Sequence, residues 1–217
     1  MTDASFKPLG RQGMAARAAQ DIPEGWYVNL GIGIPTLIAD YIPPEREVVI
    51  HSENGILGMG PAPEKHRENP WLVNASTHRV SLRTGGSYVH HADSFAVVRG
   101  GHLDLCVLGG FQVAENGDLA NWTQSANEAG RQIGGAMDLA VGAKRVWVVM
   151  EHATKDGQPR LLERCAYPLT AARCVTRVYT SLAVLDVTPT GFAVIDIIPG
   201  LSFEELQSRT AARLHRA

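Results

Sequence analysis

The sequence predicts one α/β domain over residues 1–217, with an open layered α/β/α fold around a mixed sheet. Apolar runs with the length of buried strands alternate with short helix-like segments, which is typical of a sheet covered by helices. Glycines directly follow several of these runs, as they do where loops gather at one edge of a sheet. Two late runs, 184–187 and 192–198, flank the turn sequence Thr188-Pro189-Thr190-Gly191, so an antiparallel hairpin is expected to join the sheet.

The elements follow from local patterns of apolar residues, glycine and proline. Alanine-rich segments favour helices, β-branched runs favour strands, and Pro or Gly ends each of them. In the first half of the chain we expect a helix over 12–20, a strand over 26–30, a helix over 36–42, a strand over 48–50, short strands over 71–74 and 79–83, and an extended segment over 84–95. The second half is expected to hold a strand over 105–108, a short helix opened by Gly134-Gly135, a strand over 145–150 and the late hairpin. A last helix is expected to begin with a capping box of Ser202 and Glu205, with apolar positions Phe203, Leu206 and Leu214.

Composition argues against several classes of protein. The 217 residues are 45% hydrophobic and 19% charged with a formal net charge of -2, so no basic footprint for nucleic acid is present. No apolar run approaches the ~20 residues that cross a bilayer, and no leader pattern opens the chain, so we expect no membrane role. The three cysteines fit neither a zinc site nor a redox pair; Cys106 is expected to be a core residue, and the setting reducing and cytoplasmic.

The segment 48–61 carries the strongest chemical pattern. Its apolar run ends in His51-Ser52-Glu53-Asn54-Gly55, and the glycines and proline that follow predict an irregular loop. Glu53 then lies where a strand gives way to a loop, a position that faces the ligand crevice in an open α/β sheet. Burying a carboxylate there without a cation would be costly, so we expect Glu53 to be functional.

The same residues resemble a known family. Ser52-Glu53-Asn54-Gly55 followed by Gly58-Met59-Gly60-Pro61 is similar to the active-site signature of the type I CoA-transferases, specifically the B subunit of the 3-oxoacid CoA-transferases. Further segments resemble that family in the family's order, namely 29–35, 100–104, 117–122 and 134–138. The likeness runs from about Met14 to the C-terminal helix. It implies the CoA-transferase fold, which is sugar-phosphate isomerase-like.

The resemblance also implies a reaction and a partner. In such enzymes a glutamate carboxylate attacks an acyl-CoA and then carries CoA as a glutamyl-CoA thioester, with the CoA thioester as substrate and no metal or bound cofactor. Here Glu53 is the implied nucleophile, succinyl-CoA the donor and a 3-oxoacid the acceptor. A homologous A subunit is expected to complete the site, in a heterotetramer of two A and two B subunits, so this chain alone is expected to be inactive.

The expected substrate-binding residues come from the glycine loops and from polar residues near them: Asn29, Gly31, Gly33, Asn54, His90, Gly134 and Gly135. The glycine N–H groups are the expected donors to the oxyanions of acyl transfer, although close backbone packing explains the same glycines. The histidine pair at 90–91 and the segment 174–180 are similar to the 3-oxoadipate branch and favour that acceptor. Ser76-Thr77 stands where relatives carry Gly-Lys, so Arg79 or Arg83 is expected to take over the task of that lysine.

Other interpretations are weaker or remain open. A nicotinamide-binding loop at 31–35 lacks the third glycine of the dinucleotide fingerprint. A metal site at His90-His91 is disfavoured because adjacent residues on an extended segment point to opposite faces. Open alternatives are acetoacetate or another 3-oxoacid as acceptor, a hydrolase or isomerase in which Glu53 is a general base, and a ligand-binding subunit without catalysis.

Overall fold

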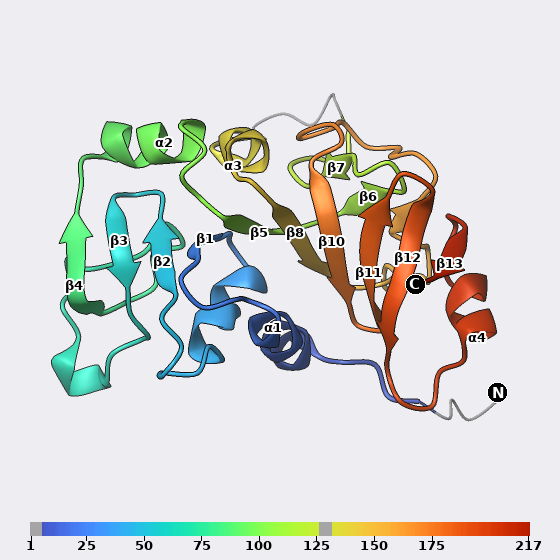
Figure 1. The fold of residues 1–217 in the computed structure, drawn as a ribbon, viewed down its shortest axis with the longest axis horizontal. Coiled ribbons are helices and arrows are strands. Elements are labelled where there is room, and N and C mark those ends of the chain that lie inside the picture. The colour runs from blue at the N-terminus through green and yellow to red at the C-terminus, as the bar shows by residue number, and fades with distance from the viewer. Residues whose placement is uncertain (1–5, 126–131) are drawn as a thin grey trace.

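The computed structural model describes residues 6–125 and 132–217 (Figure 1). The strands of the large sheet are β1 (Tyr27–Leu30), β2 (Val49–Ser52), β3 (Ile56–Met59), β4 (Leu82–Tyr88), β5 (Leu105–Gly109), β8 (Val146–Met150), β10 (Val175–Thr180), β11 (Ala183–Thr188), β12 (Gly191–Ile197) and β13 (Leu214–Arg216). They lie in the order β13-β12-β11-β10-β8-β5-β1-β2-β3-β4. A small sheet of order β7-β6-β9 holds β6 (Gln112–Ala114), β7 (Leu119–Ala120) and β9 (Leu161–Leu162).

The centre of the large sheet is parallel and its edges are antiparallel. Strands β2, β1, β5, β8 and β10 run in one direction. β3 and β4 extend one edge antiparallel, β11 and β12 extend the other, and β13 lies parallel to β12. The predicted mixed sheet and its late hairpin are therefore confirmed. The carboxyl ends of the parallel strands lie at one edge, where open α/β sheets bind their ligands.

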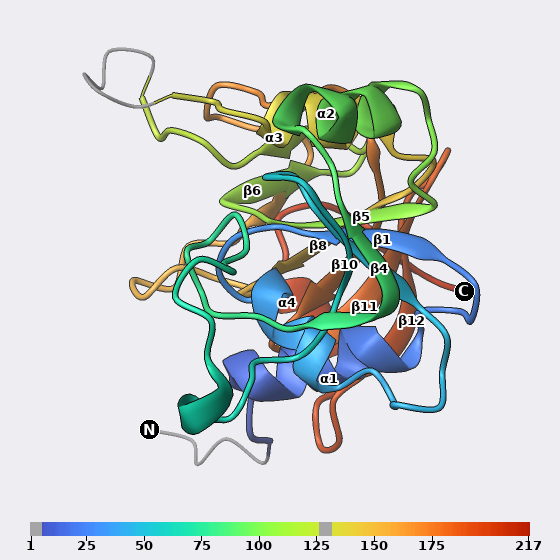
Figure 2. The ribbon, with the colours of Figure 1, turned by 90° about the vertical axis from the view of Figure 1, so that its left-hand side faces the viewer.

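Helices cover both faces of this sheet (Figures 1 and 2). α1 (Arg11–Gln20) and the 3-10 helix η1 (Pro35–Asp40) cover one face, and α2 (His91–Arg99) and α3 (Ala136–Gly142) cover the other. Strand β5 contributes to both layers: Leu105 and Val107 join the cluster that holds α1, whereas Cys106 and Leu108 join the cluster that holds α2 and α3. This is the predicted α/β/α arrangement. The remaining helices are η2 (Lys65–Arg67) and α4 (Phe203–Ser208), and none in the described ranges is long and apolar enough to cross a membrane.

The expectation of an irregular loop after Glu53 is wrong. β3 follows the turn at once and pairs antiparallel with β2. Gly58 takes a φ of +83°, and the register between β3 and β4 shifts between Leu57 and Met59. Glycine in a bulge interrupts a ladder without ending the strand, which is why the glycine-rich sequence still forms one.

Three other expected elements differ from the structure. The segment expected to be a helix over 36–42 forms a 3-10 helix over Pro35–Asp40, longer than the ~3–4 residues usual for this type. The histidine pair is not extended, because the His90 ring accepts a hydrogen bond from Ala92 N and thereby caps α2. β4 runs over 82–88, later than the strand expected over 79–83. Of the segment 84–95 that was expected to be extended, the first part is therefore strand as expected, but the residues from His91 onward are helical.

The last helix is shorter than expected. Its capping box of Ser202 and Glu205 is present as predicted. However, α4 ends at Ser208. Gln207 Nε2 donates to the carbonyls of Thr210 and Ala212, and these two bonds hold the chain after the helix in a non-helical turn. Leu214 consequently lies in β13 and not on the helix.

Candidate active site

Glu53 occupies the tight turn between β2 and β3. Ser52 pairs with Ile56 across the hairpin, so the loop consists of Glu53, Asn54 and Gly55. Gly55 takes a φ of +113° and its N–H donates to Ser52 O at 2.9 Å, the geometry that a three-residue hairpin loop requires of its last residue. A β-carbon on Gly55 would lie 2.3 Å from the carbonyl oxygen of Val89, so no other residue fits there.

The backbone around Glu53 is held from several sides. Asn54 Nδ2 donates to Val73 O at 2.7 Å, and Ala75 N donates to Ser52 Oγ at 3.0 Å. The N–H of Val89 donates to Gly55 O at 2.9 Å. By contrast, no described residue hydrogen-bonds to the Glu53 carboxylate or pairs with it, although the side chain is half-buried. The turn is fixed while its carboxylate is left available.

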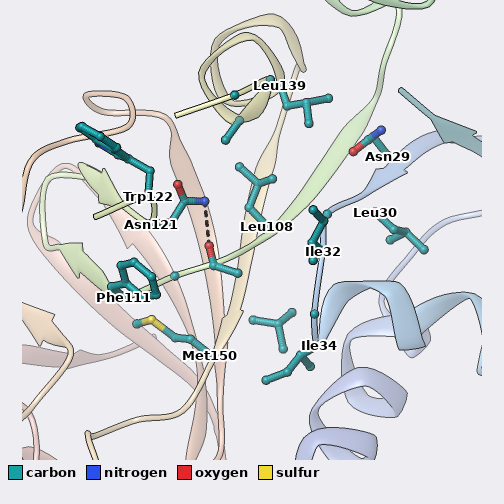
Figure 3. Close-up of a pocket in the computed structure, with 18 of the residues that line it drawn as sticks. Asn29, Leu30, Ile32, Ile34, Leu108, Phe111, Asn121, Trp122, Leu139 and Met150 are labelled. Carbon is teal, nitrogen blue, oxygen red and sulfur yellow. Dashed lines mark hydrogen bonds between the residues drawn. The ribbon is translucent and has the colours of Figure 1, made fainter. Parts of the chain in front are cut away.

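That carboxylate lines a cavity of about 810 Å³. The walls come from the carboxyl ends of β1, β5 and β8 and from the loop before α3, and Figure 3 shows Leu30, Ile32, Leu108 and Met150 around the space. The cavity thus lies at the edge of the sheet that the parallel strands predict. Its volume falls within the range of small-molecule and cofactor sites.

Glu53 faces the start of α3. A β-carbon built on Gly135 would lie 3.6 Å from Oε2 of Glu53, an ordinary contact, and 2.8 Å from Cζ of Phe95, which is too close without a shift of the ring or the loop. Gly134 has a φ of +57°, which favours glycine as well. The predicted glycine pair therefore opens a helix beside the predicted glutamate.

Burial raises the pKa of Glu53 above its ordinary value, and the nearby His91 acts in the opposite direction. A nucleophilic carboxylate calls for donors that favour the charged form, and the described residues supply none to its oxygens.

Asn29 lines the cavity but its side chain is already engaged. The side chain is buried, and Nδ2 lies 3.0 Å from Nδ1 of His51 and donates to His51 O at 3.3 Å. Nε2 of His51 lies 2.8 Å from Ser94 Oγ. Burial lowers the pKa of His51 to about 4, so the ring is neutral at pH 7. The Asn29 amide therefore braces the strand that carries Glu53.

The other expected site residues divide into two groups. Gly31, Gly33, Gly134 and Gly135 line the cavity. The N–H of Gly31 donates to Val107 O at 2.8 Å and is thus used by the fold, whereas Gly33 has a φ of +97° and open space at its α-carbon. Asn54 and His90 do not line the cavity: Asn54 bonds Val73, and His90 caps α2.

Sequence reasoning missed several residues near the site. Arg11 and Arg160 line the cavity, and no carboxylate of the described chain pairs with either guanidinium. No local pattern marks them, because α1 and the segment after β8 meet the cavity only in the folded chain. Arg79 and Arg83, the expected cations, do not line it; Arg79 instead donates to Pro70 O. His91, the neighbour of the residue that was predicted, donates to Glu53 O.

The described residues hold no group of three or more His, Cys, Asp or Glu side chains able to bind a metal ion. Cysteine nucleophiles are also disfavoured. Cys106 is fully buried, with its Sγ 3.7 Å from Asn29 Oδ1, and burial raises its pKa. Burial likewise raises the pKa of Cys165 to about 11 and that of Cys174 to about 12. A thiol that stays protonated at pH 7 is a poor nucleophile.

The fold and the site define a class of α/β protein in which a carboxylate at the C-terminal edge of a parallel sheet faces a glycine-walled cavity. An acyl-CoA transferase (YdiF) of Escherichia coli O157:H7 has this fold, with a TM-score of 0.75 and 18% identity over 98% of this chain. The match spans 42% of that longer chain, and at this identity it concerns the fold alone.

Residues 11–208 match the family model described as Coenzyme A transferase. The chain belongs to the coenzyme A transferase family. It is 55% identical to the B subunit of the 3-oxoadipate CoA-transferase of Acinetobacter baylyi over 97% of each chain. It is 45% identical to the B subunit of a probable succinyl-CoA:3-ketoacid coenzyme A transferase of Bacillus subtilis over 93% of each chain.

Proposed function

We propose that the chain is the B subunit of a CoA-transferase that moves CoA from succinyl-CoA to a 3-oxoacid, with 3-oxoadipate as the favoured acceptor. The observation that carries the proposal is the Glu53 carboxylate, unpaired among the described residues, half-buried, and lining the cavity beside Gly135. The names of the relatives support the substrate class, since both are B subunits of transferases named for 3-oxoacids.

The reaction proceeds through two covalent states of Glu53. One carboxylate oxygen attacks the thioester carbon of succinyl-CoA, and collapse of the tetrahedral adduct forms a succinyl-glutamyl anhydride and expels the CoA thiolate. The thiolate then attacks the glutamyl carbonyl carbon, which releases succinate and leaves a glutamyl-CoA thioester. The 3-oxoacid carboxylate repeats the two steps in reverse. The thioester bond is conserved, so the overall transfer needs no other energy source.

Each tetrahedral adduct carries an oxyanion that needs donors placed in advance. Gly33, Gly134 and Gly135 line the same cavity as the reacting carboxylate, and their backbone N–H groups are the donors we assign. The N–H of Gly31 is bound to Val107 and is left out of that set. The thiolate leaving group has a thiol pKa of roughly 8.5, so its departure needs little help from a general acid.

The raised pKa of Glu53 favours one alternative, in which the carboxylate is a general base for hydrolysis of an acyl-CoA. A base would hand the acyl group to water, whereas a nucleophile passes CoA to a second carboxylate. The two functions therefore differ in their need for an acceptor.

A homologous A subunit completes the active site in this proposal, in a heterotetramer of two A and two B subunits. The B subunits among the relatives support the two-chain arrangement. The partial exposure of Glu53 supports it as well, because acyl transfer without hydrolysis requires that water be kept from the anhydride.

The test is to co-express the chain with its A subunit and assay succinyl-CoA against 3-oxoadipate and acetoacetate. We expect ping-pong kinetics, a higher kcat/KM for 3-oxoadipate, and no turnover by the chain alone. Release of CoA from succinyl-CoA at the same rate with and without an acceptor would instead identify a hydrolase. A higher kcat/KM for acetoacetate would overturn the assigned acceptor and leave the transferase in place.

A further inference from the structure

Among the described residues of α2, His91 is the one whose side chain hydrogen-bonds to the main chain of Glu53. Its Nδ1 lies 3.1 Å from the carbonyl oxygen of Glu53. A carbonyl oxygen only accepts, so Nδ1 carries the proton and donates it to this bond. The ring itself lies at the exposed start of α2, outside the set of residues that line the cavity. The contact therefore acts on the position of Glu53 and not on the substrate.

The His91 ring continues into the wall beside the carboxylate. It packs edge-on against Phe95, with ring centroids 4.9 Å apart and an angle of 62° between the planes. Phe95 is the side chain that leaves no room for a β-carbon on Gly135, and Gly135 in turn passes close to Glu53 Oε2. His91 therefore neighbours both Glu53 and Phe95, Phe95 lies against Gly135, and Gly135 lies near the Glu53 carboxylate.

α2 and the residue before its N-cap bond to β2 and the β2–β3 turn at three points. Val89 N donates to Gly55 O, His91 Nδ1 donates to Glu53 O, and Ser94 Oγ lies 2.8 Å from Nε2 of the buried His51. Two of these bonds hold residues two positions before and two positions after Glu53. The His91 bond is the only one of the three made to the glutamate itself.

Four other titratable groups lie on or beside this helix: His90, Asp93, Arg99 and Asp138. Arg99 lies over the Phe95 ring, with its Cζ 5.5 Å from the centroid, and its Nε donates to Asp138 Oδ1 of α3 at 2.8 Å. Asp93 and His90 share the first turn of α2 with His91. Among these groups and His91, it is His91 that acts electrostatically on the Glu53 carboxyl, and it favours the ionised form.

We propose that His91 is a positioning residue for Glu53: its Nδ1–H fixes the glutamate main chain, and its ring, through Phe95, fixes the distance between the carboxylate and the start of α3. The inference rests on the proposed function, in which that carboxylate is the nucleophile. A nucleophile displaced by even ~1 Å loses rate while substrate binding is retained, so the loss is expected in kcat and not in KM.

The test compares three variants of His91 in the complex with the A subunit. Asparagine places an amide N–H near the position of Nδ1, glutamine places it near that of Nε2, and alanine places none. We expect His91→Ala and His91→Gln to lower kcat for succinyl-CoA on the order of 10-fold to 30-fold with KM changed by less than about 3-fold. His91→Asn is expected to retain kcat to within about 3-fold of the wild-type value. The matched control is His66→Ala, an exposed histidine on η2 that is expected to leave kcat unchanged.

Equal kcat values for His91→Asn and His91→Gln would overturn the inference, as would wild-type kcat in His91→Ala. If the alanine variant does not fold, the asparagine–glutamine comparison decides alone, because both side chains are polar and of similar size. Failure of this inference is distinct from failure of the proposed function: a wild-type complex without transferase activity contradicts the function, whereas an active complex with equal variants contradicts only the role of His91.

Discussion

Glu53 and Gly135 face each other so closely that a β-carbon on the glycine would lie 3.6 Å from Oε2 of the glutamate. The two residues are far apart in the sequence, one in a hairpin turn and the other at the start of α3. Their approach places main-chain groups of the α3 start beside the carboxylate, where an oxyanion forms in acyl transfer. The absence of a side chain on Gly135 therefore helps to shape the site.

Replacement of this glycine is expected to impair the reaction. In Gly135→Ala the new methyl would lie 2.8 Å from Cζ of Phe95, so the start of α3 and the Phe95 ring must move apart, which changes the position of the α3 start beside Glu53. We expect kcat to fall at least about 10-fold, as when an oxyanion donor is misplaced. Adding Phe95→Leu removes the clash and is expected to recover much of the loss. Steady-state assays of the complex measure both effects.

The control for this pair is Gly10→Ala, because a β-carbon added to Gly10 would meet no atom within 4 Å. It is expected to behave as the wild type. A double variant no more active than Gly135→Ala would show that the clash with Phe95 is not the cause.

Removal of the Glu53 charge is expected to abolish turnover and stabilise the fold. Burial raises the pKa of Glu53, so the ionised side chain disfavours the folded state at neutral pH. Glu53→Gln removes that penalty, and a gain of ~1 kcal/mol corresponds to a Tm rise of roughly 2–4 °C for a chain of this size. The rise in Tm is expected at pH values above the raised pKa of Glu53. It disappears as the pH falls through that pKa, because wild-type Glu53 is then protonated and carries no charge to bury. Thermal unfolding at pH 7.5 and at pH 4 checks both signs.

An unchanged or lower Tm for Glu53→Gln at pH 7.5, with the complex still assembled, would mean that the carboxylate is well solvated or paired. That result would contradict the half-buried, unpaired position of Glu53. Glu53→Asp is the companion variant: it keeps the charge, shortens the reach, and is expected to lose turnover without the gain in Tm.

The sequence placed Glu53 correctly at the end of a strand on the ligand-binding edge of the sheet, but it misplaced the surroundings of this residue. Glu53 stands out because an acidic group between an apolar strand and glycines has no structural purpose, and its position at the sheet edge follows from the strand pattern. The predicted loop after it is a strand, because Gly58 fits a bulge and local rules do not distinguish a bulge from a chain break. His91 was missed in favour of His90 because the sequence predicts an extended segment where α2 begins.

Residues that reach the site from elsewhere in the chain were beyond sequence reasoning. Arg11 and Arg160 meet the cavity only because α1 and the segment after β8 converge there. The apolar run at 105–108 did predict a buried strand, but not that the amide of Asn29 would bind His51. Local patterns fix elements, whereas partners of a polar side chain depend on the tertiary fold.

The two buried histidines are expected to make stability depend on pH. His152 lies between Thr180 Oγ1 at 3.0 Å and Thr210 Oγ1 at 2.9 Å, and burial lowers its pKa from 6.5 to about 4. The unfolded chain therefore binds protons first as the pH falls, and stability is lost progressively from about pH 6.5 to about pH 4. His152 contributes up to roughly 3 kcal/mol of this loss.

His152→Gln tests whether His152 causes the pH-dependent loss of stability. The quantity compared is the slope of the free energy of unfolding against pH, and not its absolute value. Urea unfolding between pH 7 and pH 4 is expected to show a shallower pH dependence for the variant. His66→Gln, at an exposed position, is expected to keep the wild-type slope. Parallel slopes for wild type and His152→Gln would contradict the buried, neutral state of His152.

The two cavity arginines are expected to bind anionic parts of the substrates. Arg160→Gln and Arg11→Gln are each expected to raise KM about 10-fold, as for loss of a charge-assisted hydrogen bond. A rise for 3-oxoadipate but not for acetoacetate would assign the arginine to the distal carboxylate, and an equal rise for succinyl-CoA with either acceptor would assign it to CoA. Arg164→Gln, exposed and outside the cavity lining, is the control. Unchanged KM values for every substrate would contradict the expectation.

The most direct test is to look for CoA on Glu53. The complex with the A subunit is incubated with succinyl-CoA without acceptor, quenched in acid and digested, and the peptide that contains Glu53 is analysed by mass spectrometry. We predict a CoA thioester on Glu53 that hydroxylamine converts to a hydroxamate and that 3-oxoadipate discharges. Transferase turnover with no adduct on Glu53, or with the adduct on another residue, would contradict the nucleophilic role of this carboxylate.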